Sequence, residues 1–547
     1  MMMMIIWFHQ TDRGYDGKYV LLGDTNARNR RIEEATSKAT AFEDSSSPLS
    51  PFSPTDGALG NRNASFDPYP RSDQPLAFPS RFWPSVLEAV AAEERCARAG
   101  GEIVRSREIG RFARMARVTA TGVPEKFQSI QLQEEFDTFD CDVHMFPDLQ
   151  YLKKRSKIIE IVSVKDVIFV VAQSGLCAAF SRTTNKRICF LNISPGEIIR
   201  SIFYNKNDES LITVSVYASD HFSSLKCRTT PIEYIRRNQL DAGCPLFETE
   251  SIKWPGFVEF CDMNCKILIY SSQDGTYKVF DLKNYSLLHS ICDKDIVDIK
   301  ISPSMMLLVY QRTLGHVPLK ILSIEDGKVL KSFNHSLHRN KKVDFIEQFN
   351  EKLLVKQENE NLQILDVWNS DLIEVSRTEF MTPSAFIFLY EKHLFLTFRN
   401  RTVAVWNVRG EQVASFEDHL LWHPDCNTNN IYITTDLDLI ISSCKAENVC
   451  HDEGEVPSVG SINVGDILTG KCIAKICPLD PHLQIGPRKR GDAGRSTIGS
   501  TIKEALENVT ALFYDEDRNE IYTGNEQGLV HVWSKPHISR DNLPACL

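Results

Sequence analysis

The pattern of apolar and polar positions is clearest near the end of the chain. Residues 509–514 are rich in β-branched and aromatic side chains, a polar turn follows at 515–519, and strand-like residues resume at 521–523. A second turn at 524–528 leads into Leu-Val-His-Val-Trp at 529–533. This pattern predicts three short antiparallel strands.

The second turn and the last strand of this unit recur earlier in the chain. Residues 268–283 contain Val-Phe-Asp-Leu-Lys at their end, and residues 395–407 end in Val-Ala-Val-Trp-Asn. Weaker copies cover residues 353–366 and 168–180. One such unit cannot bury both of its faces, so a stable fold requires a series of them.

A strand–turn–strand–turn–strand unit that ends in Val-x-Val-Trp resembles one blade of a WD-repeat β-propeller. Trp533 and Trp406 take the tryptophan position, and the departures from the pattern are Phe280 for Trp and Ser534 and Asn407 for Asp. The resemblance is closest to divergent, plant-type transducin/WD-repeat-like proteins. It implies an all-β fold and a non-catalytic interaction scaffold, whose rims and inserted loops hold other proteins or peptides.

Counting units along the chain predicts eight blades, with seven as the alternative if one pair merges. The units are 157–192, 197–254, 256–293, 295–334, 343–380, 383–419, 429–478 and 507–534. The predicted organisation is a disordered to partly helical extension at 1–125, a linker at 126–156, a propeller at 157–535 and a polar tail at 536–547.

The last unit has only three strands, so an N-terminal segment is expected to close the ring by pairing with it. Residues 127–132 and 141–146 both alternate apolar and polar side chains. We favour residues 141–146, because they lie nearer the first unit and because 127–132 adjoin an acidic stretch at 134–140.

The composition agrees with these predictions. Apolar residues make up 42% and charged residues 24% of the 547 residues, which is ordinary for a globular protein. The net charge of −10 argues against a general nucleic-acid binder. No run approaches the ~20 apolar residues of a membrane span, and the first residues lack the basic region of a signal peptide. We therefore expect an intracellular protein of the nucleus or cytoplasm, without a membrane partner.

Motifs for catalysis and for cofactor binding are missing from the sequence. There is no phosphate-binding Gly-Lys-Ser/Thr loop, no His-Glu-x-x-His helix and no G-x-S-x-G elbow. Neighbouring Cys and His residues lack the four-ligand spacing of structural zinc sites. We therefore expect no enzyme, catalytic residue, cofactor or metal. A hydrolase acting at the propeller mouth is the less favoured alternative, and it would need acidic and histidine residues converging in one pocket.

Two of the predicted third strands carry a more specific candidate. Residues 279–283 and 405–409 resemble the Trp-Asp-x-Arg ending of WD-repeat substrate receptors, which dock on the adaptor of a cullin-RING ubiquitin ligase. The resemblance implies the docking residues Phe280, Asp281, Lys283, Trp406, Asn407 and Arg409. Ordinary strand ends remain the favoured interpretation, because the pattern consists largely of WD-repeat residues.

Two short basic clusters are candidates for recognition by nuclear import factors. The first contains Lys153, Lys154, Arg155 and Lys157, and the second contains Arg488, Lys489 and Arg490. Such clusters also occur by chance on solvated loops. The second cluster belongs to an insertion at 480–504 that is polar and contains glycines, which predicts a surface loop outside the ring.

Overall fold

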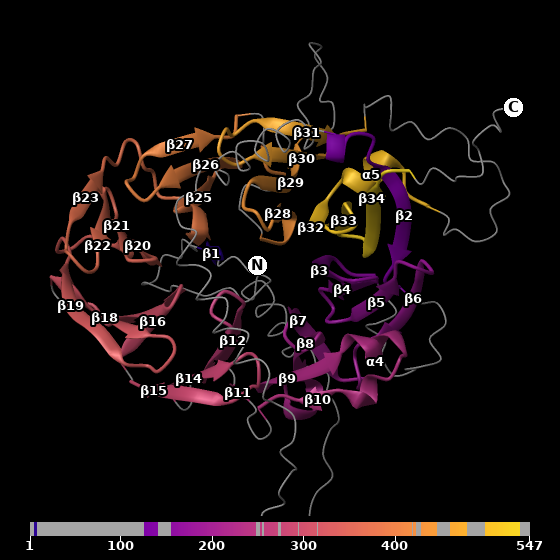
Figure 1. Cartoon of the computed structure of the whole chain (residues 1–547), viewed down its shortest axis with the longest axis horizontal. Helices are drawn as coiled ribbons and strands as arrows, with labels where there is room; N and C mark the ends of the chain where they lie inside the picture. The colour runs from indigo at the N-terminus through magenta and orange to yellow at the C-terminus, as the bar shows by residue number, and fades with distance from the viewer. Residues whose placement is uncertain are drawn as a thin grey trace, which may run out of the picture. The chain divides into compact units, whose positions relative to one another are not determined.

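The strands form eight antiparallel sheets that stand side by side around a ring (Figure 1). In this computed structural model the described residues are 5–7, 125–139, 155–247, 252–253, 256–271, 275–293, 295–313, 315–417, 420–422, 428–445, 460–478 and 498–536. All of them belong to one unit of the chain. The prediction of an all-β propeller is confirmed, with eight blades rather than seven.

Within each run of consecutive strands that forms a blade, the first strand lies towards the ring centre and the later ones lie further out (Figure 1). Blade 1 contains β3 (Ile158–Val164), β4 (Val167–Ala172), β5 (Cys177–Ser181) and β6 (Lys186–Phe190). Blade 2 contains β7 (Glu197–Asn205), β8 (Ser210–Tyr217), β9 (Ser224–Pro231), β10 (Cys244–Pro245) and β11 (Ile252–Lys253). Blade 3 contains β12 (Gly256–Cys261), β13 (Lys266–Ser271), β14 (Thr276–Asp281) and β15 (Leu287–Cys292). Blade 4 contains β16 (Ile296–Ser302), β17 (Met305–Tyr310), β18 (His316–Ser323) and β19 (Val329–Ser336).

The other four blades follow in chain order. Blade 5 contains β20 (Val343–Phe349), β21 (Lys352–Gln357), β22 (Leu362–Asp366) and β23 (Leu372–Val375). Blade 6 contains β24 (Ala385–Leu389), β25 (Leu394–Arg399), β26 (Thr402–Asn407) and β27 (Gln412–Ser415). Blade 7 contains β28 (Ile431–Ile433), β29 (Leu439–Lys445), β30 (Gly460–Asp466) and β31 (Cys472–Ile476). Blade 8 contains β32 (Val509–Asp515), β33 (Glu520–Asn525) and β34 (Leu529–Ser534). Short α-helices in the described residues include α4 (Ile232–Arg236) and α5 (Ile502–Leu506).

The burial pattern follows from the stacking of the blades. The second strands are buried on both faces, as in β4, where all six residues of Val-Ile-Phe-Val-Val-Ala are buried. Outer strands such as β15 instead alternate between partly buried and exposed side chains over much of their length. Apolar clusters fill the space between neighbouring blades, for example where Phe203 stacks on Phe260 with ring centroids 4.7 Å apart. The core is therefore a series of interfaces between sheets.

The two tryptophans that carry the sequence pattern make the same buried contact. Trp533 Nε1 donates a hydrogen bond to Thr523 Oγ1, and Trp406 Nε1 donates one to Thr397 Oγ1, both at 2.9 Å. A buried indole N–H normally finds a partner of this kind. The repeated Trp of blades 6 and 8 thus ties the third strand to the second.

The ring closes through a strand that the sequence analysis did not favour. Strand β2 (Gln131–Asp137) pairs antiparallel with β34 and completes blade 8. The prediction that residues 141–146 pair with β34 is wrong, because β2 occupies that position. Residues 141–146 themselves lie outside the described part of the chain. Buried Leu132 and Phe136 alternate with polar neighbours, and the Phe136 ring stacks on Phe180 of blade 1 at 4.9 Å. The stretch read as acidic linker is therefore the closing strand.

The N-terminal extension also differs from prediction at one point. Strand β1 (Ile5–Trp7) pairs antiparallel with β24 and adds a fifth strand to the inner side of blade 6. The sequence predicts a disordered to partly helical extension here, without a strand, and β1 corrects that prediction. The other predictions for residues 1–124 lie outside the described residues, as does the predicted insertion loop at 480–504 up to residue 497. The end of that insertion is not a loop, because α5 begins at Ile502.

Candidate functional site

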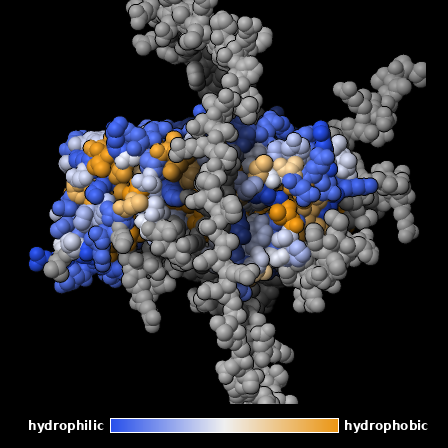
Figure 2. Space-filling view, turned by 90° about the horizontal axis from the view of Figure 1, so that it is seen from below, coloured by the Kyte–Doolittle hydropathy of each residue, from blue (hydrophilic) through white to orange (hydrophobic). Residues whose placement is uncertain are grey.

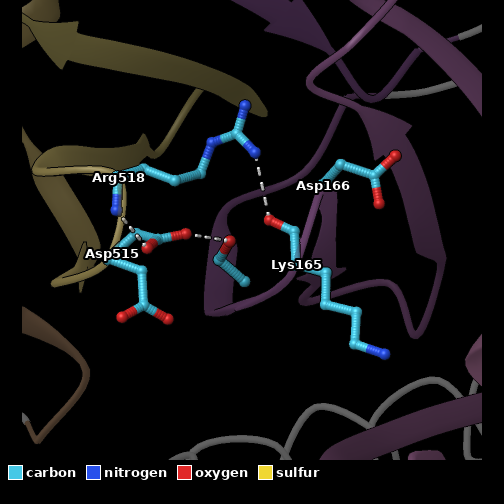
Figure 3. Close-up of a pocket in the computed structure, with 6 residues that line it drawn as sticks. Lys165, Asp166, Asp515 and Arg518 are labelled. Carbon is cyan, nitrogen blue, oxygen red and sulfur yellow. Dashed lines mark hydrogen bonds between the residues drawn. The ribbon is translucent and has the colours of Figure 1, made fainter.

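A surface pocket lies where the last blade meets the first. Two turns line it, one between β3 and β4 and the other between β32 and β33, and its volume is about 360 Å³. The lining residues are Ser163, Lys165, Asp166, Asp515, Asp517 and Arg518. Figure 3 shows the Arg518 side chain reaching from blade 8 to the backbone carbonyl of Lys165 in blade 1, where it donates a hydrogen bond of 3.3 Å.

Most charged groups of this pocket already have protein partners. Asp515 accepts a hydrogen bond of 2.7 Å from Ser163 and one of 3.0 Å from the Arg518 backbone N–H. Lys165 Nζ lies 2.6 Å from the Glu209 carboxylate, and Asp166 forms an ion pair with Arg236 of α4. The arrangement therefore joins blades 8, 1 and 2 and offers a shallow, mixed-charge surface, rather than a set of free catalytic groups.

A second candidate is a buried ionic cluster on the inner strands of blades 3 to 5. Lys300 Nζ lies 2.9 Å from Asp298 and 2.8 Å from Glu347, and all three side chains are at most 5% exposed. Glu259 of the neighbouring blade takes part electrostatically in the same cluster. Three carboxyl groups therefore share one lysine.

The excess of carboxyl groups perturbs their protonation. Burial raises the pKa of Glu347 and of Glu259 to about 7 each, although the nearby Lys300 ammonium opposes the shift. Asp298 adds to the increase because its negative charge disfavours a second carboxylate nearby. Such perturbed groups occur at functional sites and in structural ion networks alike. No histidine is among the described groups that shift these two pKa values.

Glu347 is expected to make the protein less stable as the pH rises. Its folded-state pKa of about 7 exceeds the ordinary value of 4.5, so its contribution is fully present below pH 4.5 and is lost as the pH passes through about 7. Glu347→Gln should therefore flatten the decline in unfolding free energy between pH 5 and pH 8, by a term on the order of 3 kcal/mol. Urea denaturation at pH 5 and at pH 8 measures this change in the free energy of unfolding.

The matched control for this experiment is Glu358→Gln, which alters an exposed carboxyl group of the same blade. It should leave the pH dependence of the wild type unchanged. An equal slope for the wild type and Glu347→Gln would contradict the assignment.

The third candidate is an apolar surface on the outer strands of blades 3 to 6. The pairing register slips by one residue in β15, β19 and β27, and the residues displaced there are Leu288, Leu330 and Val413. They are 37%, 46% and 43% exposed, because a bulge redirects its side chain. We call the full set the rim belt: Leu287, Leu288, Val329, Leu330, Leu372, Ile373 and Val413.

Exposed apolar side chains at equivalent positions of four successive blades form an unusual surface. Figure 2, a view onto the edge of the ring, shows hydrophobic residues gathered among hydrophilic ones on the outer surface. Apolar residues scattered singly over a surface need no explanation, whereas contiguous apolar patches mark interaction sites. The adjacent exposed pairs Leu287-Leu288, Val329-Leu330 and Leu372-Ile373 make the rim belt a candidate surface for holding another protein.

The six residues implied in adaptor docking fall in two separate blades. Phe280 and Trp406 are buried, whereas Lys283 and Arg409 are exposed in the turns that follow. Asp281 accepts a hydrogen bond from the Lys283 N–H at 2.7 Å, and Asn407 accepts one from the Arg409 N–H at 2.9 Å. Asn407 therefore preserves the turn that Asp forms in blade 3. Blades 4 and 5 lie between the two motifs, so the structure does not bring them together.

The nuclear-import candidates lie only partly within the described structure. Arg155 and Lys157 are described, whereas Lys153, Lys154, Arg488, Lys489 and Arg490 are not. Arg155 Nη2 lies 2.5 Å from Asp137 at the end of the closing strand, so it already has a structural partner. Among the described helices, none is long and apolar enough to cross a membrane.

Sequence reasoning missed the ionic cluster and the rim belt. The polar residues of the cluster, Glu259, Asp298, Lys300 and Glu347, were passed over inside strands predicted only from apolar patterns. Charged residues repeated inside successive inner strands were the available signal. The paired apolar residues at the start of β15, β19 and β23 gave a similar signal for the belt.

The described part of the chain is an eight-bladed β-propeller, and the comparisons place it more narrowly. The chain belongs to a family described as a domain of unknown function (DUF7899), whose model matches residues 115–533. A comparison with curated proteins finds no match. Among solved structures, the computationally designed protein Ika8 is similar to it at 16% identity, with a TM-score of 0.42 over 70% of this chain and 96% of that protein.

Proposed function

We propose that this protein is a non-catalytic interaction scaffold of the WD-repeat type, and that the rim belt is its main docking surface. The observation that carries the proposal is the exposure of apolar side chains at equivalent positions of blades 3 to 6. Burial of such surface by a partner is favourable by about 25 cal/mol per Å² of apolar area. The tryptophan–threonine hydrogen bonds of blades 6 and 8 support the WD-repeat resemblance.

The double variant Leu288→Glu/Leu330→Glu is expected to lose partner proteins while remaining folded. Both side chains are exposed, and surface substitutions usually change stability by less than ~0.5 kcal/mol. A charge placed at the centre of an apolar contact would have to be desolvated without a partner, which opposes docking. Proximity labelling in cells, followed by mass spectrometry, should show neighbours of the wild type that the variant lacks.

Leu468→Glu provides the matched control. Leu468 is 52% exposed in blade 7, outside the rim belt, so the control makes the same chemical change on the same ring. It should retain the wild-type neighbours. Identical neighbours for the wild type and the double variant would refute the rim belt as the docking surface.

A substrate receptor of a cullin-RING ligase is the more specific alternative. The observation in its favour is that Lys283 and Arg409 are exposed beside a buried aromatic residue in the same kind of turn. Lys283→Ala and Arg409→Ala should leave the fold intact, and one of them should abolish recovery of the ligase adaptor in an affinity purification. Unchanged recovery after both replacements would rule out this docking mode.

A further inference from the structure

The inner edges of the blades are protected in different ways, and this difference identifies one of them as a strand-binding site. The innermost strand of a blade leaves one row of backbone N–H and C=O groups unpaired, which other chains can use to add a strand. Bulges interrupt the pairing of five inner strands with their neighbours: β3, β7, β16, β20 and β32. Bulges twist an edge away from a flat, receptive shape.

Two further inner strands have other protection. Strand β28 has only three residues, which is too short to accept much of a partner strand. Strand β12 pairs without a register shift but carries Glu259, whose carboxyl group belongs to the ionic cluster of Lys300, and an ionisable side chain on an edge strand discourages added strands. Among the eight inner strands described, β24 is the one with none of these features. Its five residues, Ala-Phe-Ile-Phe-Leu, pair with β25 in regular register.

Strand β24 is also the inner strand that β1 covers. The pairing is antiparallel, with Ile5 opposite Ile387, Ile6 opposite Phe386 and Trp7 opposite Ala385. The sheet of blade 6 accordingly runs β1-β24-β25-β26-β27, with β1 towards the ring centre (Figure 1). The most receptive inner edge is therefore the edge that the chain itself covers.

We propose that the inner edge of β24 binds an extended, uncharged apolar segment of a partner protein, and that β1 occupies this site until the partner displaces it. Within the described residues, β1 pairs with three of the five residues of β24, Ala385 to Ile387. A partner strand that pairs along all five residues of β24 would compete with β1 for this edge. Strand addition of this kind takes its affinity from the main chain and its specificity from alternate side chains.

A peptide-binding experiment on the full-length chain tests this exchange. The probe is a fluorescein-labelled peptide of residues 1–12, which contains the β1 sequence, and fluorescence anisotropy measures its binding. The variant Ile5→Pro/Ile6→Pro releases β1: alternate residues of an antiparallel strand bond to the partner, so one of the two prolines removes a needed donor. Thr11→Pro/Asp12→Pro is the matched control outside β1.

The expected result is that Ile5→Pro/Ile6→Pro binds the peptide at least tenfold more tightly than the wild type and the control. Hydrogen exchange should then be slowed at residues 385–389 by the added peptide. Equal binding by all three chains would overturn the proposal, as would a folded Ile5→Pro/Ile6→Pro variant that does not bind, or binding without slowed exchange at residues 385–389. A wild-type dimer in light scattering that dissociates in the Ile5→Pro/Ile6→Pro variant would also overturn it, because β1 would then serve a second copy.

The strand-binding site gives the proposed scaffold a class of partner. It rests on the proposed scaffold function only for its biological use. Its test employs purified components and a surface other than the rim belt. Failure of the rim-belt experiment together with tight peptide binding would therefore refute the outer docking surface alone. The converse result would refute the inner strand site alone.

Discussion

A chain that begins at residue 139 is expected to lose cooperative unfolding and to aggregate, whereas a chain that begins at residue 121 should keep cooperative unfolding and aggregate less, because it retains β2. The first truncation removes β2 and thereby exposes the edge of β34, which is a template for pairing with other chains. The second removes the three residues of β1 and keeps β2. Thermal melts and size-exclusion chromatography of the two truncations measure the difference.

The expected loss of stability can be estimated from the apolar side chains that the larger truncation removes. Four of them are at most 3% exposed: Phe127, Ile130, Leu132 and Phe136. Each buried side chain of this size contributes ~1.5–3 kcal/mol, so together they supply roughly 6–12 kcal/mol as an upper estimate. That sum is comparable to the whole stability of a typical domain, about 5–15 kcal/mol.

Polar contacts of β2 add to the same closure. Glu135 lies opposite His531, whose Nε2 is 3.4 Å away, and accepts hydrogen bonds from the backbone N–H groups of Ser500 and Gly499 at 3.0 and 3.3 Å. Burial alone would raise the pKa of Glu135, but the interaction with His531 and then the hydrogen bonds from Ser500 and Gly499 lower it to about 2. Equal melting temperatures and solubility for the two truncations would show that the ring closes without β2.

The eight blades could be predicted from the sequence because each blade repeats a local pattern. A run of β-branched and aromatic residues, a polar turn and a second run lie within some forty residues, and the second strands need a continuous apolar run because neighbouring blades cover both faces. The predicted first unit, 157–192, accordingly contains β3 to β6. The predicted last unit, 507–534, contains β32 to β34.

The closing strand was not predicted, because its polar residues lie opposite a strand that is nearly 400 positions away in the chain. Glu134 and Glu135 look like part of an acidic linker, yet Glu134 is 6% exposed and Glu135 lies opposite His531. Nothing within the stretch itself indicates that a histidine will satisfy one of its carboxylates. The short strand β1 was missed for a related reason, since three apolar residues give no period.

The candidate surfaces depend on contacts between blades and were harder still to predict. A pair such as Leu287-Leu288 reads as strand core, and only the register of β14 against β15 shows that Leu288 is displaced outward. The sharing of Lys300 by Asp298 and Glu347 requires the spacing of two inner strands. The local sequence pattern defines the strands. Contacts between strands of different blades are defined only by the packing of the sheets.

Arg182→Ala is expected to destabilise the ring by ~3–5 kcal/mol, the usual cost of removing one partner from a buried ion pair. Arg182 of blade 1 binds Glu520 of blade 8 through two hydrogen bonds, from Nε at 2.9 Å and from Nη2 at 2.7 Å. The two side chains are 8% and 11% exposed. Without the guanidinium group, the Glu520 carboxylate keeps the hydroxyl of Tyr522, at 2.6 Å, and the more distant Arg518.

The stability that Arg182→Ala loses is expected to depend on pH. Burial alone would raise the pKa of Glu520, but hydrogen bonds from Arg182 and Tyr522 lower it on balance below the ordinary 4.5. The contribution of the pair is therefore present above pH 4.5 and is lost as the pH falls through the folded-state pKa. Urea denaturation at neutral pH should show the full difference between the wild type and Arg182→Ala, and the difference should narrow below pH 4.5.

Replacement of both charged partners separates the effect of the ion pair from that of the fold around it. Arg182→Met/Glu520→Gln removes both charges and keeps similar side-chain volumes, so it should cost less than Arg182→Ala alone, because no unpaired carboxylate remains buried. Lys165→Ala serves as the control, since Lys165 forms an exposed ion pair in the neighbouring turn and should change stability by at most ~1 kcal/mol. If Arg182→Ala were no more costly than Lys165→Ala, the junction of blades 8 and 1 would not depend on this pair.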